Sequence, residues 1–121
     1  MDQRKKGSLV ISALGMTVPV KLKPDGNVVW IRVGDVDFIA VGKEQALILD
    51  EIAFGIRQSY PFRFKCHGGT VDAKISGDGN KWITFGFGIW IFPIPLQIET
   101  EGFRDLIRNV LALLREAVPA A

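Results

Sequence analysis

The chain has 121 residues, is 48% hydrophobic, 10% aromatic and 23% charged, and carries a formal net charge of +2. This composition excludes a disordered chain, which would be more polar and poorer in aromatic residues. The length predicts one domain. The single Cys66 excludes an internal disulfide framework and a zinc site built from cysteines. We therefore expect a reducing compartment, a cytoplasmic location and no cofactor.

Residues 1–7 form a basic tail, and the predicted domain extends over residues 8–118. The cations of the tail, at positions 4–6, are not followed by the apolar core of a signal peptide. The most apolar segment, residues 83–98, is shorter than the ~20 residues that a spanning helix needs and contains two prolines and two glycines. We therefore expect no insertion into a membrane.

Residues 8–27 align with residues 61–80 without a gap when the sequence is shifted against itself by 53 places. The identical pairs are Gly15/Gly68, Thr17/Thr70, Val18/Val71, Lys21/Lys74, Asp25/Asp78, Gly26/Gly79 and Asn27/Asn80. Unrelated segments of this length share roughly one position, so the sequence predicts an internal duplication, with repeats over 8–59 and 60–118.

The first repeat has strand-like runs of apolar residues on both sides of Asp25-Gly26, which predicts a two-residue hairpin turn. This turn pairs Lys21 with Trp30, and the alternation of a strand then separates the side chains into two faces. The core face holds Val20, Leu22, Val29, Ile31 and Val33. The outer face holds Lys21, Lys23, Trp30 and Arg32.

An indole among cations on a sheet surface is typical of a platform for single-stranded nucleic acid, because bases stack on the ring and the cations contact phosphates. The alternative is that the lysines only solvate this face and that Trp30 packs under a helix or a partner subunit. Asp35 and Asp37 follow near a turn. With no histidine or third carboxylate nearby in the sequence, we interpret them as solvated residues rather than as a catalytic pair.

Residues 43–58 have helical spacing and predict a helix at the end of the first repeat. Its apolar face carries Ala46, Leu49, Ala53 and Ile56. Tyr60-Pro61 marks the joint between the repeats.

The second repeat carries a second set of candidate cations, which are Arg63, Lys65, Lys74 and Lys81. A two-residue turn at residues 78–79 puts Lys74 on the same face as Phe85 and Phe87. A bulge there instead brings Trp82 to the outer face, as the equivalent of the first indole. The two registers place every side chain of the strand on opposite faces.

The last predicted helix has apolar residues three and four positions apart. They are Phe103, Leu106, Ile107, Val110, Leu113, Leu114 and Ala117. Thr100 is the expected N-cap, because a threonine hydroxyl can accept a hydrogen bond from the free backbone N–H groups of the first turn.

The expected fold class is α+β, with two tandem β-β-β-β-α repeats whose curved antiparallel sheets are backed by helices. This element order, with the stretches "NVVWIRV" and "NKWITFG", resembles the PUR-domain proteins and, more loosely, the PC4 and Whirly single-stranded-DNA-binding proteins. The resemblance implies an intertwined pair of repeats, or a dimer, that binds single-stranded DNA or RNA on its sheets while the helices pack on the other side.

These observations predict a protein that is not an enzyme, with no catalytic or metal-ligating residues, and that binds single-stranded DNA or RNA. The first contact residues are Lys21, Lys23, Trp30 and Arg32, and the second are Arg63, Lys65, Lys74 and Lys81. The alternative is a homo-oligomeric assembly protein whose exposed aromatics, among them Trp90 and Phe92, form a subunit interface. A homodimer is compatible with both hypotheses.

Overall fold

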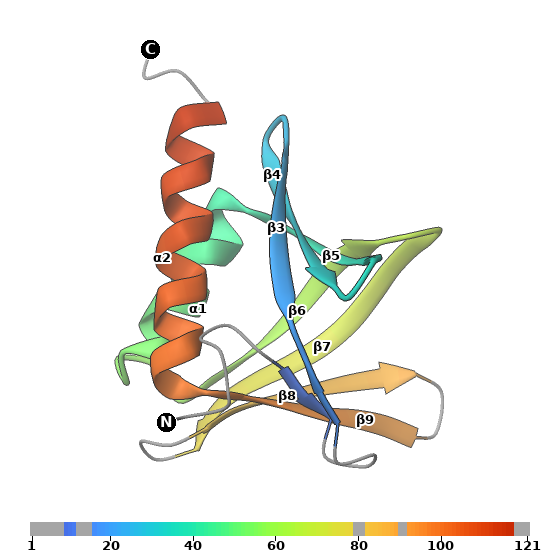
Figure 1. Ribbon diagram of the computed structural model, residues 1–121. Helices are drawn as coiled ribbons and strands as arrows, with labels where there is room; N and C mark the ends of the chain where they lie inside the picture. Colours follow the sequence, from blue (N-terminus) through green and yellow to red (C-terminus); the bar gives the residue numbers. More distant parts are fainter. Residues whose placement is uncertain (1–8, 12–15, 79–81, 90–91, 118–121) are drawn as a thin grey trace.

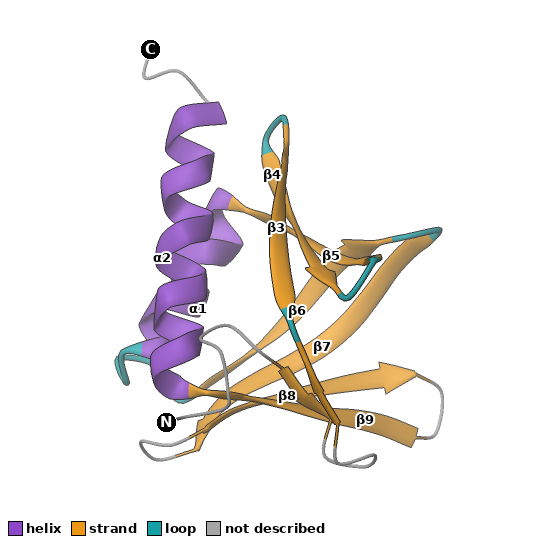
Figure 2. Ribbon diagram, in the orientation of Figure 1, coloured by secondary structure: helices purple, strands orange, loops and turns teal. Residues whose placement is uncertain are grey.

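A computed structural model describes residues 9–11, 16–78, 82–89 and 92–117 of the chain. Within these residues the chain forms nine strands and two helices (Figure 2). The strands are β1 (Leu9–Ile11), β2 (Met16–Val18), β3 (Val20–Asp25), β4 (Val28–Val33), β5 (Val36–Gly42), β6 (Ser59–Cys66), β7 (Gly69–Asp78), β8 (Trp82–Ile89) and β9 (Phe92–Glu99). The helices are α1 (Lys43–Ala53) and α2 (Thr100–Ala117). The predicted α+β class, with an antiparallel sheet and helices, is confirmed.

All nine strands belong to one sheet, in the order β2-β1-β9-β8-β7-β6-β5-β4-β3. The two ends of this order, β2 and β3, are consecutive in the chain and only Pro19 separates them. Proline has no N–H to donate to a neighbouring strand, so it interrupts the pairing. The carbonyl of Pro19 still accepts a hydrogen bond of 3.1 Å from the backbone N–H of Gly34. The first half of the chain therefore has five strands where four were predicted. Pro19 connects β2 and β3, the two strands at opposite ends of the sheet order.

The two halves of the chain, residues 8–59 and 60–118, are joined twice within this sheet. β5 of the first half pairs with β6 of the second half through Ala40 and Lys65. β1 pairs with β9 over three residues, beginning with Leu9 opposite Ile98. Within each half, consecutive strands pair with one another, apart from the break at Pro19.

Each helix packs on strands of the other half as well as on its own. α1 contacts β6 and β7 of the second half, and α2 contacts β3 and β4 of the first half. The two helices also contact each other and lie on the same side of the sheet (Figure 1). Because each helix packs on strands of both halves, neither half buries its apolar surface by itself.

The core combines large side chains from both halves. Val29 and Leu49 come from the first half, and Phe64, Phe103 and Ile107 come from the second, each at most 1% exposed. They belong to one continuous apolar cluster. Burying a side chain of this size contributes about 1.5–3 kcal/mol, so the stability of each half depends on the other.

α1 ends at Ala53 and not at residue 58 as its spacing predicted. The backbone of Gly55 has a φ of +77°, a left-handed conformation that favours glycine. The N–H groups of Gly55 and Ile56 donate hydrogen bonds of 3.2 and 2.8 Å to carbonyls of the last helical turn, a pattern that closes a helix. Ile56 therefore lies beyond the helix and is 74% exposed, instead of belonging to its apolar face.

The apolar stripe predicted for α2 is confirmed where its side chains are described. The buried members are Phe103, Leu106, Ile107, Val110 and Leu114, and Leu111 is buried beside them. Thr100 is the first residue of the helix and is buried. Its hydroxyl has no hydrogen-bond partner within the described residues, so the predicted capping role is wrong.

Candidate nucleic-acid interface

The hairpin of β3 and β4 turns at residues 26–27, not at 25–26 as the sequence predicted. Asp25 lies directly opposite Val28. Gly26 has a φ of +62°, the left-handed conformation that two-residue hairpin turns require and that glycine adopts without strain.

The actual register differs from the predicted one by two residues. Lys23 lies opposite Trp30, and Lys21 lies opposite Arg32. Because side chains alternate with a period of two, a shift of two residues leaves each side chain on its predicted face. Toward the core the hairpin presents Val20, Leu22, Val29, Ile31 and Val33, which are buried or partly buried against α2 and the rest of the core. The four candidate contact residues share the outer face.

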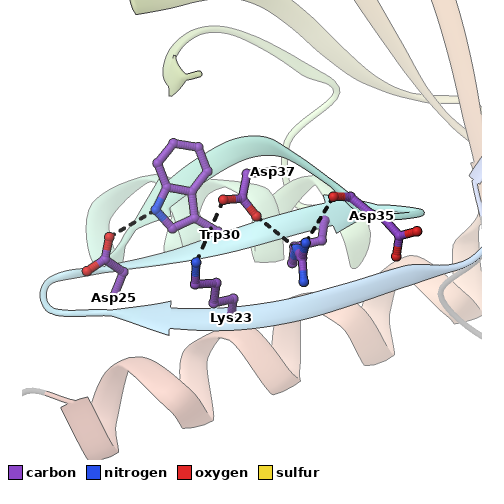
Figure 3. A network of polar contacts seen from close by, with 6 residues as sticks. Lys23, Asp25, Trp30, Asp35 and Asp37 are labelled. Atoms are coloured by element: carbon purple, nitrogen blue, oxygen red, sulfur yellow. Dashed lines mark hydrogen bonds and ion pairs between the residues drawn. The ribbon is translucent and has the colours of Figure 1, made fainter. Parts of the chain in front are cut away.

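Trp30 is half-buried on this outer face and is not enclosed in the interior. Its indole Nε1 donates a hydrogen bond of 3.1 Å to Oδ2 of Asp25, at the end of the same hairpin (Figure 3). The hydrogen bond limits the rotation of the ring. The alternative in which Trp30 packs under a helix of the same chain is therefore wrong.

Asp37, which the sequence suggested was simply solvated, lies among the cations of the hairpin. Its Oδ1 is 2.8 Å from Nε of Arg32, and its Oδ2 is 3.8 Å from Nζ of Lys23. Nη2 of Arg32 also donates a hydrogen bond of 2.9 Å to the backbone carbonyl of Asp35. Nε of Arg32 and Oδ1 of Asp37 are shielded from solvent and meet as an ion pair without the alignment of a hydrogen bond. In Figure 3 Asp37 lies between Trp30 and Asp35.

The position of Asp37 follows from the next turn of the chain. Residues 34–35 connect β4 to β5, and Gly34 has a φ of +62°. This two-residue turn places Arg32 opposite Asp37, and a bulge beyond this pair shifts the rest of the strand. The dipeptide Gly34-Asp35 is itself a hairpin signal, so the ion pair could have been found in the sequence.

Lys21 is exposed and forms no ion pair with any residue that the structure describes. Of the three cations on the outer face, two are thus paired with one carboxylate, and Lys21 has no ion pair within the described residues. We call the set Lys21, Lys23, Trp30, Arg32 and Asp37 the Trp30 surface.

The pairing of strands aligns a cation of the second half with Trp30. Trp30 lies opposite Ala40 of β5, and Ala40 lies opposite Lys65 of β6. Directly opposed residues in a sheet project to the same face, so Lys65 lies on the outer face two strands from Trp30, a separation of about 10 Å. Lys65 is exposed, and so is Arg63, two residues earlier on the same face.

Arg63 is paired with a carboxylate of the neighbouring strand. Its Nε donates a hydrogen bond of 2.9 Å to Oδ1 of Asp72, which lies opposite it in β7. This hydrogen bond, and then the attraction between the charges, lower the pKa of Asp72 and raise the pKa of Arg63. Because both side chains are more than 60% exposed, water screens the pair and it contributes little to stability.

Lys74 is also exposed, but it lies farther along β7, opposite Pro61. Phe85 and Phe87 of β8 pair with the buried Ile75 and Ala73, whereas Lys74 pairs with a glycine. The register that joined Lys74 to these phenylalanines is therefore wrong. Lys81, the basic tail and Trp90 lie outside the described residues.

Trp82 does not take the place that Trp30 has in the first half. It is the first residue of β8, beside the turn. The 53-residue shift aligns Ser76 with Lys23, and the residue opposite Ser76 is Thr84. Trp82 lies opposite Asp78, on the same alternation as Ser76 and Lys74, so the register that put it on the outer face is confirmed, although it stands two positions earlier in its strand than Trp30 does in β4.

Comparison of the chain with protein-family models, with curated proteins and with solved structures finds no match. In the part of the chain that the structure describes, no three His, Cys, Asp or Glu side chains lie close enough together to hold a metal ion. The helices of that part are too short or too polar to span a membrane.

Proposed function

We propose that this protein binds single-stranded DNA or RNA on the outer face of the β3–β4 hairpin. A base stacks on the indole of Trp30, and phosphates are contacted by Lys21 and by the cations beside it. The observation that carries this proposal is a half-buried indole that is hydrogen-bonded to Asp25 and shares the outer face of the hairpin with three cations. Stacking depends on the flat face that every base has, so this chemistry favours binding with little sequence preference.

The cations of β6 extend the proposed path across the sheet. Lys65 is in register with Trp30 through Ala40, whose small side chain is covered by its neighbours and is only 2% exposed. Arg63 lies next to Lys65 on the same face. We therefore include Lys65 and Arg63 in the proposed interface and place Lys74 at its margin. This surface also favours a role that is not enzymatic.

We also propose that the two halves arose by duplication of one β-β-β-β-α unit. If β2 and β3 are counted as one strand interrupted at Pro19, both halves have four strands followed by a helix. The pairings of β5 with β6 and of β9 with β1 are then equivalent junctions. The packing of each helix on both halves supports the intertwined arrangement that the PUR-like resemblance implies.

Replacing Trp30 by alanine tests the proposed function. We expect Trp30→Ala to weaken binding of a labelled single-stranded oligonucleotide by roughly tenfold or more, since stacking on an aromatic ring contributes about 1–3 kcal/mol per base. Fluorescence anisotropy at two salt concentrations measures the affinity. Trp30→Phe, which keeps a ring, is the matched control and should lose less.

Two results would contradict the proposal in different ways. An unchanged affinity in Trp30→Ala would show that the binding site lies elsewhere. No binding by the wild-type chain would remove the function itself and favour the second candidate, an assembly protein. That candidate is supported by exposed apolar side chains away from the hairpin face, at Val36, Leu47 and Ile56. It requires a homo-oligomer in solution, which light scattering detects.

A further inference from the structure

We propose that Asp37 is an internal counter-ion of the Trp30 surface, which limits the affinity of this surface for phosphate by occupying Arg32 and Lys23. This inference rests on the proposed function and concerns the same site. It assigns to Asp37 the role of setting how many phosphates the surface neutralises and, with that, how strongly salt weakens binding.

Both oxygens of the Asp37 carboxylate are engaged with cations of this surface. Oδ1 meets Arg32 at 2.8 Å, and Oδ2 is 3.8 Å from Lys23. The side chain of Asp37 is 31% exposed and that of Arg32 is 34% exposed, so the pair is accessible at its rim although its facing atoms are shielded. A single carboxylate thus takes the place that a phosphate group would take between these two side chains.

The guanidinium of Arg32 is held from two directions. Asp37 contacts its Nε, and the backbone carbonyl of Asp35 accepts a hydrogen bond from its Nη2. A guanidinium presents a planar fork that suits a carboxylate and a phosphate equally well. A phosphate therefore gains Arg32 only by displacing Asp37, and an undisplaced Asp37 repels the phosphate.

Asp37 lies close to Trp30, so it competes for Arg32 with the phosphate next to the base that stacks on Trp30. In Figure 3 the carboxylate of Asp37 lies beside the indole of Trp30, on the side away from Asp25. The backbone of a nucleotide stacked on Trp30 must pass near this carboxylate or near the hydrogen-bonded Asp25 on the other side of the ring. Lys21, which is unpaired within the described residues, is then the principal phosphate contact of the hairpin in the wild-type chain.

Asp37→Asn tests this inference because the amide keeps the shape of the side chain and removes its charge. At 50 mM salt we expect the affinity for a single-stranded oligothymidylate to rise roughly threefold to thirtyfold, the range for removing one charge about 6 Å from a phosphate at the surface. The slope of log affinity against log salt should become steeper by about 0.7 for each phosphate gained. The gain should shrink as the salt concentration rises.

Glu44→Gln is the matched control, because it changes the net charge of the chain by the same amount. Glu44 is exposed in the first turn of α1, outside the hairpin. We expect its affinity to rise by less than about threefold and its salt slope to be unchanged, since none of the described ion pairs joins Glu44 to Arg32 or Lys23. Thermal unfolding shows whether each variant is folded. Asp37→Ser replaces Asp37→Asn if the amide variant unfolds.

The outcomes separate this inference from the proposed function. Wild-type binding together with tighter, more salt-sensitive binding by Asp37→Asn supports both. Wild-type binding with an unchanged or weaker folded variant overturns the inference and leaves the function in place. Binding by the variant but not by the wild type supports the counter-ion and contradicts the function. If neither chain binds, or if Glu44→Gln gains as much as Asp37→Asn, the inference is wrong.

Discussion

Phe64→Ala is expected to lower the free energy of unfolding by about 3–5 kcal/mol, the usual result of truncating a fully buried phenylalanine. Phe64 is 0% exposed, on the core face of β6. Its ring stacks on that of Phe62, with centroids 5.1 Å apart and planes 11° from parallel. Urea unfolding followed by circular dichroism measures the change, and a domain of ordinary stability would lose a large fraction of its total.

Val36→Ala is the control for this experiment, because Val36 is also an apolar strand residue but is 63% exposed. It should change the free energy of unfolding by less than about 0.5 kcal/mol. A loss below about 1 kcal/mol in Phe64→Ala would mean that β6 does not cross the core as described.

Separating the chain into residues 1–58 and 59–121 is expected to abolish folding of both fragments as monomers. α2 would lose β3 and β4, on which it packs, and α1 would lose β6 and β7. The buried faces of Phe103 and Ile107 would then be open to water. The expected loss is the whole stability of the domain, on the order of 5–15 kcal/mol.

Circular dichroism of each fragment at low micromolar concentration, followed by mixing, measures this effect. The separate fragments should show no cooperative thermal transition, and the equimolar mixture should recover one. The intact chain at the same concentration is the control. A fragment that unfolds cooperatively and has the mass of a monomer would show that the packing of each helix on both halves is not essential.

The faces of the first hairpin could be predicted from the sequence although its register could not. Alternation depends only on whether a position is odd or even, and the turn at residues 26–27 instead of 25–26 changed the pairing by two. Trp30 and its cations therefore reached the predicted face by a pairing that was not predicted. In β8 the sequence left two registers open, and the pairing of Trp82 with Asp78 is the one that puts Trp82 on the outer face.

Asp37 and Lys65 differ in how far their places at the candidate site could be predicted from the sequence. Arg32 and Asp37 are five positions apart, and the two-residue turn at residues 34–35 places them opposite each other, so this contact rests on a local signal in the sequence. Lys65 joins Trp30 only because β5 and β6 are neighbours in the sheet. Such a neighbour relation is a property of the whole sheet and leaves no trace in local periodicity.

By itself the sequence determined the α+β class, the buried stripe of α2, and the separation of lysines and indole from the core in the first hairpin. These features depend on the spacing of apolar residues, which is a local property of the chain. Only the tertiary structure decided that each helix packs on both halves of the chain and that Lys65 lies in register with Trp30. Each of these depends on contacts between segments that come together when apolar surface from both halves is buried in one core.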